Sequence, residues 1–261
     1  MMKDIYQHFR KEEQEKITMF NGRFEIAERD YYPVLLDFLD PRERKIVESL
    51  SGSYPEVRVE FYGGGGKNRE RQRGMIIPEM LEVSKDDFDV LVYEIDYPDK
   101  FVTLNHRNVL GAVMNLGLDR SLIGDIVALD TIQIAIARPY APMFEQSLTR
   151  IKNAPVTLRE IPHEAFVDAE DDGRPMVILS SSFRLDTIVS EVINEGRAKS
   201  KSRVEKSKVK VNHSIVTDPS FIMETGDIVS VRHFGRFRIN SLIAETRKGK
   251  YRLEVRLYRD G

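Results

Sequence analysis

The 261-residue sequence contains no cysteine and no tryptophan. Without cysteine the chain can form neither a disulfide bond nor a thiolate metal site, as is common in proteins of a reducing cytoplasm. The first residues lack the apolar run of a secretory signal peptide, and no apolar stretch approaches the length of a membrane span. We therefore expect a cytoplasmic protein that does not associate with membranes.

Residues in the pattern of a catalytic or metal site are also scarce. Residues 169–175 form an acidic turn with three consecutive carboxylates, whereas metal sites take their ligands from alternating or distant positions. No two histidines have metal-ligand spacing, and none lies beside an obvious serine nucleophile. We expect no catalytic residue, no metal and no cofactor. The histidines are His8, His106, His163, His213 and His233.

A glycine-rich loop, Gly63–Gly66, precedes Lys67 and invites comparison with a phosphate-binding loop. Such a loop requires glycine five positions before its Gly-Lys pair and a hydroxyl residue after the pair. Phe61 and Asn68 occupy these positions, so the match fails. The sequence favours a flexible connection with a solvated charged edge. Nucleotide binding and a basic loop that touches RNA are the alternatives.

Charge is plentiful but unevenly distributed. The formal net charge is −2, and hydrophobic residues make up 41% of the chain, which is enough for packed cores. Residues 183–261 contain 17 Lys and Arg against 10 Asp and Glu, whereas the rest of the chain contains 23 against 32. An acidic body with a basic C-terminal module indicates a localised contact with a polyanion.

The N-terminal region has mainly helical signals. Residues 1–52 are predicted to be helical, with separate helices over 4–16, over 31–39, and from Pro41 to Gly52. Proline is well placed at a first helical position. Residues 57–61 alternate like a strand.

The middle of the chain follows a β-α-β-β-α-β order, which is the ferredoxin-like arrangement. Many RNA-recognition modules share it, but the predicted third strand carries no aromatic ring that could stack on a base. We therefore expect no stacking of single-stranded RNA on this domain. The predicted strands are 88–97, 124–129, 131–136 and 156–161, and the predicted helices are 108–116 and 139–152.

The C-terminal region contains the basic cluster. Apolar residues recur at helical spacing over 183–193, and a short second helix is predicted over 196–206, followed by strands over 208–212 and 228–231. Lys199, Arg203 and Lys206 fall on one face of the second helix. A helix held by its neighbours with cations facing outward suits a phosphate backbone.

A further strand over 230–239 is predicted to place Arg232, Phe234, Arg236 and Arg238 on one face. Cations interleaved with an aromatic ring suit RNA, although a solvated sheet face has a similar pattern. We predict that the RNA-binding residues are Arg184, Arg197, Lys199, Lys201, Arg203, Lys206, Lys208, Lys210, Asn212, Arg232, Arg236 and Arg238.

Residues 184–186, 209–212, 219–220 and 226–229, together with Arg197, resemble the S4-type RNA-binding domain, named after ribosomal small-subunit protein S4. Residues 230–239 are more similar to one subgroup, the bacterial YlmH family. Segments resembling that family also occur at 61–64, 71–78, 109–118 and 123–126, so the resemblance covers nearly the whole chain. It implies a role in translation: binding of ribosomal RNA or tRNA on the large ribosomal subunit, in quality control of stalled peptidyl-tRNA.

Two other functions are compatible with the sequence. Arg184-Leu185-Asp186 resembles the triplet that carries the catalytic aspartate of pseudouridine synthases, but it lies where a helix is predicted to start, and a structural aspartate is favoured. A middle-domain carboxylate is another candidate catalyst for an RNA-modifying enzyme. The other function is that of an interaction protein, linked to cell division, whose basic module docks an acidic partner.

Taken as a whole, the sequence predicts an α+β protein of several parts. These are a helical or mixed region at 1–80, a ferredoxin-like domain at 81–165, a connecting segment at 166–182, and an S4-type domain with additional strands at 183–261. We expect a monomer that binds structured RNA and no DNA.

Overall fold

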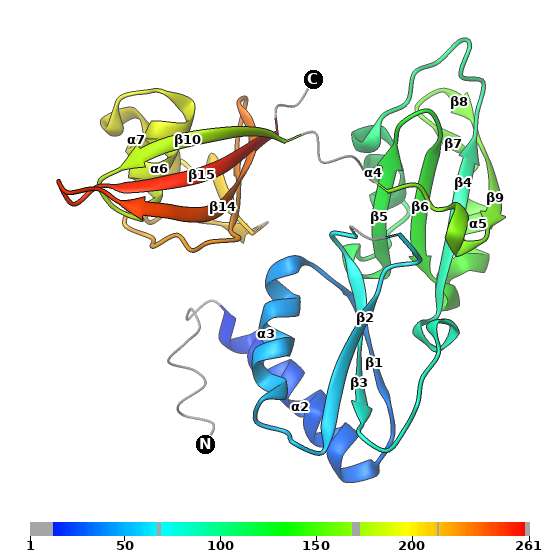
Figure 1. Cartoon of the computed structure of the whole chain (residues 1–261). Coiled ribbons are helices and arrows are strands. Elements are labelled where there is room, and N and C mark those ends of the chain that lie inside the picture. The colour runs from blue at the N-terminus through cyan, green and yellow to red at the C-terminus, as the bar shows by residue number, and fades with distance from the viewer. Residues whose placement is uncertain (1–12, 67–68, 169–172, 213, 259–261) are drawn as a thin grey trace. The chain divides into compact units, whose positions relative to one another are not determined.

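The computed structural model describes residues 13–66, 69–168, 173–212 and 214–258. The chain divides into two compact units, residues 1–169 and residues 170–261 (Figure 1). No helix in the described parts of the chain is long and apolar enough to cross a membrane.

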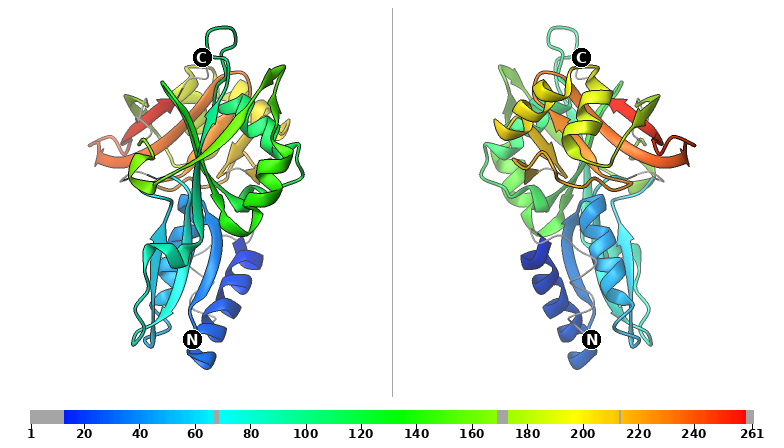
Figure 2. Two further views of the ribbon diagram at one scale, coloured as in Figure 1. Left: turned by 90° about the vertical axis from the view of Figure 1, so that its right-hand side faces the viewer. Right: turned by 90° about the vertical axis from the view of Figure 1, so that its left-hand side faces the viewer.

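In the described part of the first unit, two helices lie on a three-stranded antiparallel sheet (Figures 1 and 2). The helices are α2 (Gln14–Asp30) and α3 (Pro41–Ser51), and the strands are β1 (Val34–Leu39), β2 (Val57–Tyr62) and β3 (Gln72–Pro78), in the order β1-β3-β2. The prediction for Pro41 is confirmed, since α3 begins there. Asp40 caps the helix by accepting hydrogen bonds from the backbone N–H groups of Arg42 and Glu43.

The predicted helix over 31–39 is wrong, because residues 34–39 form β1. The short apolar run Val34-Leu35-Leu36 fits a helix or a strand equally well, and pairing with β3 decides between them. Tyr31, in the left-handed conformation at φ 48°, ends α2 just before this strand. Most of the predicted helix over 4–16 lies outside the described residues.

The middle sheet confirms the ferredoxin-like prediction. Its strand order is β5-β6-β4-β9 and every pairing is antiparallel. Helix α5 is shorter than the predicted 139–152, because residues 150–155 form a small hairpin, β7 with β8. The elements are β4 (Val90–Asp96), α4 (His106–Met114), β5 (Ile123–Ala128), β6 (Ile132–Ala137), α5 (Ala141–Ser147), β7 (Arg150–Ile151), β8 (Ala154–Pro155) and β9 (Thr157–Ile161).

The apolar centre of the middle sheet is buried on both faces. Helices α4 and α5 cover one face, where Val109, Val113 and Phe144 pack with the apolar side chains of the strands. The opposite face packs against the first sheet. Its residues Val90, Val92, Val127, Ala135 and Ala137 form one cluster with Phe38, Met75 and Ile77 of β1 and β3.

Gly63 and Gly64 of the glycine loop are buried, so the prediction of a solvated connection is wrong for these two residues, whereas Gly66 is exposed. A Cβ on Gly64 (φ +92°) would lie 2.9 Å from Val92 Cγ2, and one on Gly65 (φ +105°) would lie 2.2 Å from the carbonyl oxygen of His163. Glycine is therefore required at both positions. Lys67 and Asn68 lie outside the described residues.

Arg69 fixes the end of this loop. Its side chain is 1% exposed and donates hydrogen bonds to the carbonyl oxygens of Gly65, Phe166 and Val167 at 2.7 to 2.9 Å. The guanidinium also lies 3.5 Å from the centre of the Phe166 ring. Arg69, which the sequence placed at a solvated edge, is therefore buried in the first unit.

The second unit is a six-stranded antiparallel sheet with two helices. The strand order is β10-β15-β14-β13-β11-β12. Residues 174–180, at the end of the expected connecting segment, form the edge strand β10 and pair with β15. The elements are β10 (Arg174–Ser180), α6 (Leu185–Ile193), α7 (Arg197–Glu205), β11 (Val209–Val211), β12 (Ser214–Ile215), β13 (Ile228–Val231), β14 (Gly235–Glu245) and β15 (Tyr251–Tyr258).

The two helices pack on one face of this sheet (Figures 1 and 2). Leu185, Ile188 and Val189 of α6 and Val204 of α7 form a single core with the inward-facing side chains of the strands. The inward side chains include Val209, Val229, Phe237, Val255 and Leu257. Because side chains alternate along a strand, the residues between them lie on the opposite, open face.

The predicted strand over 230–239 is not continuous. Residues 232–234 form a turn that joins β13 to β14, with His233 at φ 66° and Gly235 at φ 128°. Arg232 is consequently exposed on the turn, and Phe234 packs against the apolar core. Only Arg236 and Arg238 remain on one strand face as predicted.

Candidate RNA-binding surface

The start of α6 is joined to the start of α7 through Asp186. This carboxylate is 2% exposed and accepts hydrogen bonds from Arg184 Nε at 3.1 Å and Arg197 Nε at 3.3 Å. Burial raises the pKa of Asp186, but the hydrogen bond from Arg184 and the charges of both arginines outweigh it and hold that pKa below its usual value. Asp186 thus positions two of the predicted RNA-binding residues.

A second carboxylate, Glu195, contacts three side chains of α7. It accepts hydrogen bonds from Arg203 Nε at 2.7 Å and Ser200 Oγ at 2.9 Å, and Lys199 Nζ lies 3.5 Å away. Burial raises the pKa of Glu195, but the hydrogen bonds from Arg203 and Ser200 outweigh it, and the net pKa is lowered. Arg203, with 26% of its side chain exposed, links α7 to Glu195, which lies just before the start of the helix, and has a structural role.

The other cations of this helix face outward. Lys199 and Arg197 keep 70% and 57% of their side chains exposed, and Lys201, also 57% exposed, lies 3.7 Å from Glu205. Lys206 and Lys208 follow at the end of α7 and are exposed. Together Arg197, Lys199, Lys201, Lys206 and Lys208 form what we call the helix surface.

Asn212 has a structural position. At φ 47° it turns the chain after β11, where its Nδ2 donates to Asp227 at 2.7 Å and its Oδ1 accepts from the Ile228 backbone at 3.0 Å. Both ends of the amide are engaged inside the unit. The sequence placed Asn212 among the cations, whereas its contacts join β11 to β13.

Of the remaining predicted residues, Arg232 lies on the turn between β13 and β14, and Lys210, Arg236 and Arg238 lie on the open face of the sheet. Lys210 is exposed on β11, and Arg236 and Arg238 are half-buried on β14. In the described part of the chain, neither Arg236 nor Arg238 forms an ion pair. The structure adds Arg256 and Tyr258 of β15 to this face, directly opposite Arg238 and Arg236. Their alternation with Leu253, Val255 and Leu257 was a signal in the sequence that could have identified them.

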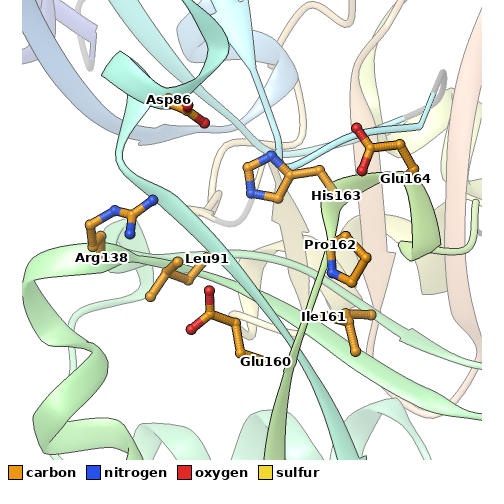
Figure 3. Close-up of a pocket in the computed structure, with 8 residues that line it drawn as sticks. All are labelled: Asp86, Leu91, Arg138, Glu160, Ile161, Pro162, His163 and Glu164. Carbon is orange, nitrogen blue, oxygen red and sulfur yellow. The ribbon is translucent and has the colours of Figure 1, made fainter.

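The first unit contains a pocket of about 480 Å³ with an acidic lining (Figure 3). Asp86, Glu160 and Glu164 contribute carboxylates, which repel phosphate, and Arg138 is the cation of the lining. His163 is fixed by Tyr62 Oη at 2.7 Å and the Val90 carbonyl oxygen at 3.0 Å. Within the residues described, no group of three or more potential ligands could hold a metal ion. The remaining lining residues are Leu91, Ile161 and Pro162.

Comparisons with known proteins match a separate family model to each of the two units. A family model described as a putative RNA-binding domain in YlmH matches residues 84–165, and the S4 domain model matches residues 183–229. A Bacillus subtilis (strain 168) protein named ribosome-associated protein quality control protein P2 is 36% identical over 259 residues, covering 97% of this chain and 98% of that protein. A solved structure, cell division protein ylmH from Streptococcus pneumoniae, matches with a TM-score of 0.55 and 30% identity, over 62% of this chain and 99% of that one.

Proposed function

The chain belongs to the YlmH family, and we propose that it binds structured ribosomal RNA or tRNA on the large ribosomal subunit, where it acts on subunits stalled with peptidyl-tRNA. The names of its relatives denote RNA binding and association with the ribosome in protein quality control. The proposal goes further in naming the subunit and the stalled substrate.

The observation that carries the proposal is the helix surface. Asp186 and Glu195 fix the two ends of α7, so that its outward cations are presented on a rigid support. Phosphate contacts depend on such positioned cations, and they release condensed counterions when RNA binds. A duplex stem presents regularly spaced phosphates that suit this row of exposed cations.

The buried position of Asp186 supports binding over catalysis for the Arg-Leu-Asp triplet. Both oxygens of its carboxylate accept hydrogen bonds, from Arg184, Arg197 and the Thr187 hydroxyl. The triplet therefore fits a structural role, in which Asp186 positions Arg197 of the helix surface.

The proposal is tested by sedimentation of the purified protein with separated ribosomal subunits. We expect the protein to travel with large subunits, more so when they carry peptidyl-tRNA, and not with small subunits. The variant Lys201→Ala with Lys206→Ala should bind several-fold more weakly. Arg23→Ala with Lys45→Ala removes two exposed cations from the first unit and serves as the matched control. Equal sedimentation with both subunits, or with neither, would contradict the proposal.

A further inference from the structure

The open face of the C-terminal sheet carries an ordered row of polar side chains. Lys210 lies directly opposite Ser230, Ser230 opposite Arg236, and Arg236 opposite Tyr258. Side chains directly opposite each other in an antiparallel sheet are about 5 Å apart at Cβ, so the row runs continuously across four strands. Two of these strands, β14 and β15, lie beyond the residues matched to the S4 domain.

A second pair on this face has like charges. Arg238 of β14 lies directly opposite Arg256 of β15, and Arg236 is two residues from Arg238 on the same face. The pair brings two guanidinium groups side by side on the open face, and a planar guanidinium is well suited to phosphate.

The row also contains an aromatic platform. The Arg236 guanidinium lies 5.1 Å from the centre of the Tyr258 ring, so a planar cation and a ring meet on the sheet. Both groups stack on nucleobases without selecting one base. Single-stranded RNA offers unstacked bases and phosphates together, whereas a duplex keeps its bases stacked inside.

We propose that this open face, formed by Lys210, Arg236, Arg238, Arg256 and Tyr258, binds a single-stranded RNA segment. It is distinct from the helix surface, because the helices lie on the opposite face of the same sheet. The choice of RNA as the partner rests on the proposed function. One module would then hold a structured RNA on its helix side and a single strand on its sheet side.

The test uses the full-length protein and a fluorescein-labelled oligouridylate, which forms no stem. Arg236→Ala with Arg238→Ala should weaken its binding at least tenfold and reduce the log–log salt slope by about 1.4, because a single strand gives about 0.7 per phosphate contact. Lys201→Ala with Lys206→Ala, which removes the same charge from the helix surface, should leave oligouridylate binding within twofold. Circular dichroism confirms that both variants are folded.

Tyr258 supplies an independent check. Tyr258→Ala should weaken oligouridylate binding about fivefold or more, and Tyr258→Phe, which keeps the ring, should not. The inference is overturned if wild-type protein does not bind oligouridylate, if the folded sheet variant binds it normally, or if the helix variant loses as much. Sedimentation with large subunits is measured in parallel, so that failure of the proposed function shows in that assay alone.

Discussion

Two of the antiparallel sheets, the middle sheet and the C-terminal sheet, each carry a pair of helices on one face but differ in their other face. In the middle sheet that face is apolar and lies under β1 and β3, with Phe38 fully buried between the two sheets. In the C-terminal sheet the equivalent face carries Lys210, Arg236 and Arg238. The same two-layer architecture thus supports packing in one unit and exposes cations in the other.

This difference bears on where RNA can bind. RNA-recognition modules of the ferredoxin-like type stack bases on the sheet face opposite their helices. Here Gly64 and Met75 pack against Val90, Val92 and Ala135, so this apolar part of the face is inaccessible to bases while the first unit is folded. The same face is exposed toward the ends of β4 and β9, where Asp96 and Arg159 lie.

The largest expected effect on stability comes from truncating Phe38, which packs between the first sheet and the middle sheet. Phe38→Ala should lower the stability of the first unit by about 3–5 kcal/mol, because it leaves a cavity where a fully buried ring packs against two sheets. Hydrogen exchange should show faster exchange in β3 and β4, with α6 unchanged, since each unit opens separately.

A matched control in the same unit is Phe101→Ala. Phe101 is 87% exposed, so its removal should change stability by less than about 0.5 kcal/mol. If Phe38→Ala were equally harmless, the middle sheet could not depend on the first sheet for its cover.

A smaller effect is expected at the loop between the two sheets. Arg69→Ala should cost about 2–4 kcal/mol, because it leaves buried carbonyl groups of Gly65, Phe166 and Val167 without their donor. Hydrogen exchange around residues 163–168 should increase first. A variant with wild-type protection there would mean that Arg69 does not hold this segment.

The C-terminal unit should instead be sensitive to acid. Asp186 and Glu195 have folded-state pKa values below their ordinary values. Their ion pairs therefore stabilise the unit above the unfolded pKa values near about 4, and this contribution is lost as the pH falls through the folded-state values. Asp186→Asn should cost about 1–3 kcal/mol at neutral pH and flatten the loss of stability below about pH 5.

The measurement is denaturant unfolding of the C-terminal unit across that pH range. Glu191→Gln, a change at an exposed position on α6, is the control and should leave stability unchanged. If the unfolding free energy of Asp186→Asn depended on pH as that of the wild type does, the acid sensitivity would come from other carboxylates.

Much of this architecture was predictable because its signals are local. The β-α-β-β-α-β order followed from alternation and helical spacing, and the start of α3 followed from Asp40-Pro41. The strand 34–39 was not predictable, because its pairing partner β3 lies more than thirty residues away. The buried glycine loop depends on a neighbour even more distant in sequence, His163.

The sequence identified the cations of α7 and β14 that make up much of the candidate site, but not their arrangement. Helical spacing placed Arg203 and Lys206 on one face, but it could not show that Glu195, just before the helix, binds Arg203. Likewise, Arg236 and Arg238 were assigned to one strand face, whereas their neighbours Arg256 and Tyr258 come from a pairing that only the folded sheet establishes.

The smallest expected effect on stability distinguishes Arg203 from Lys206, two cations that helical spacing places on the same face of α7. Arg203→Ala should lower stability by about 1 kcal/mol, since a 2.7 Å hydrogen bond to the largely buried Glu195 is lost. Lys206 is exposed at the end of α7, so Lys206→Ala should leave stability unchanged. Its effect should appear only in binding to a stem-loop RNA, as about a threefold loss and a salt slope smaller by about 0.9, the value for one duplex phosphate contact. Thermal melts and a salt series on both variants measure the two effects. If Lys206→Ala changed stability and left the slope intact, the exposed end of α7 would be a structural element, and the RNA contacts of the helix surface would have to lie nearer Arg197.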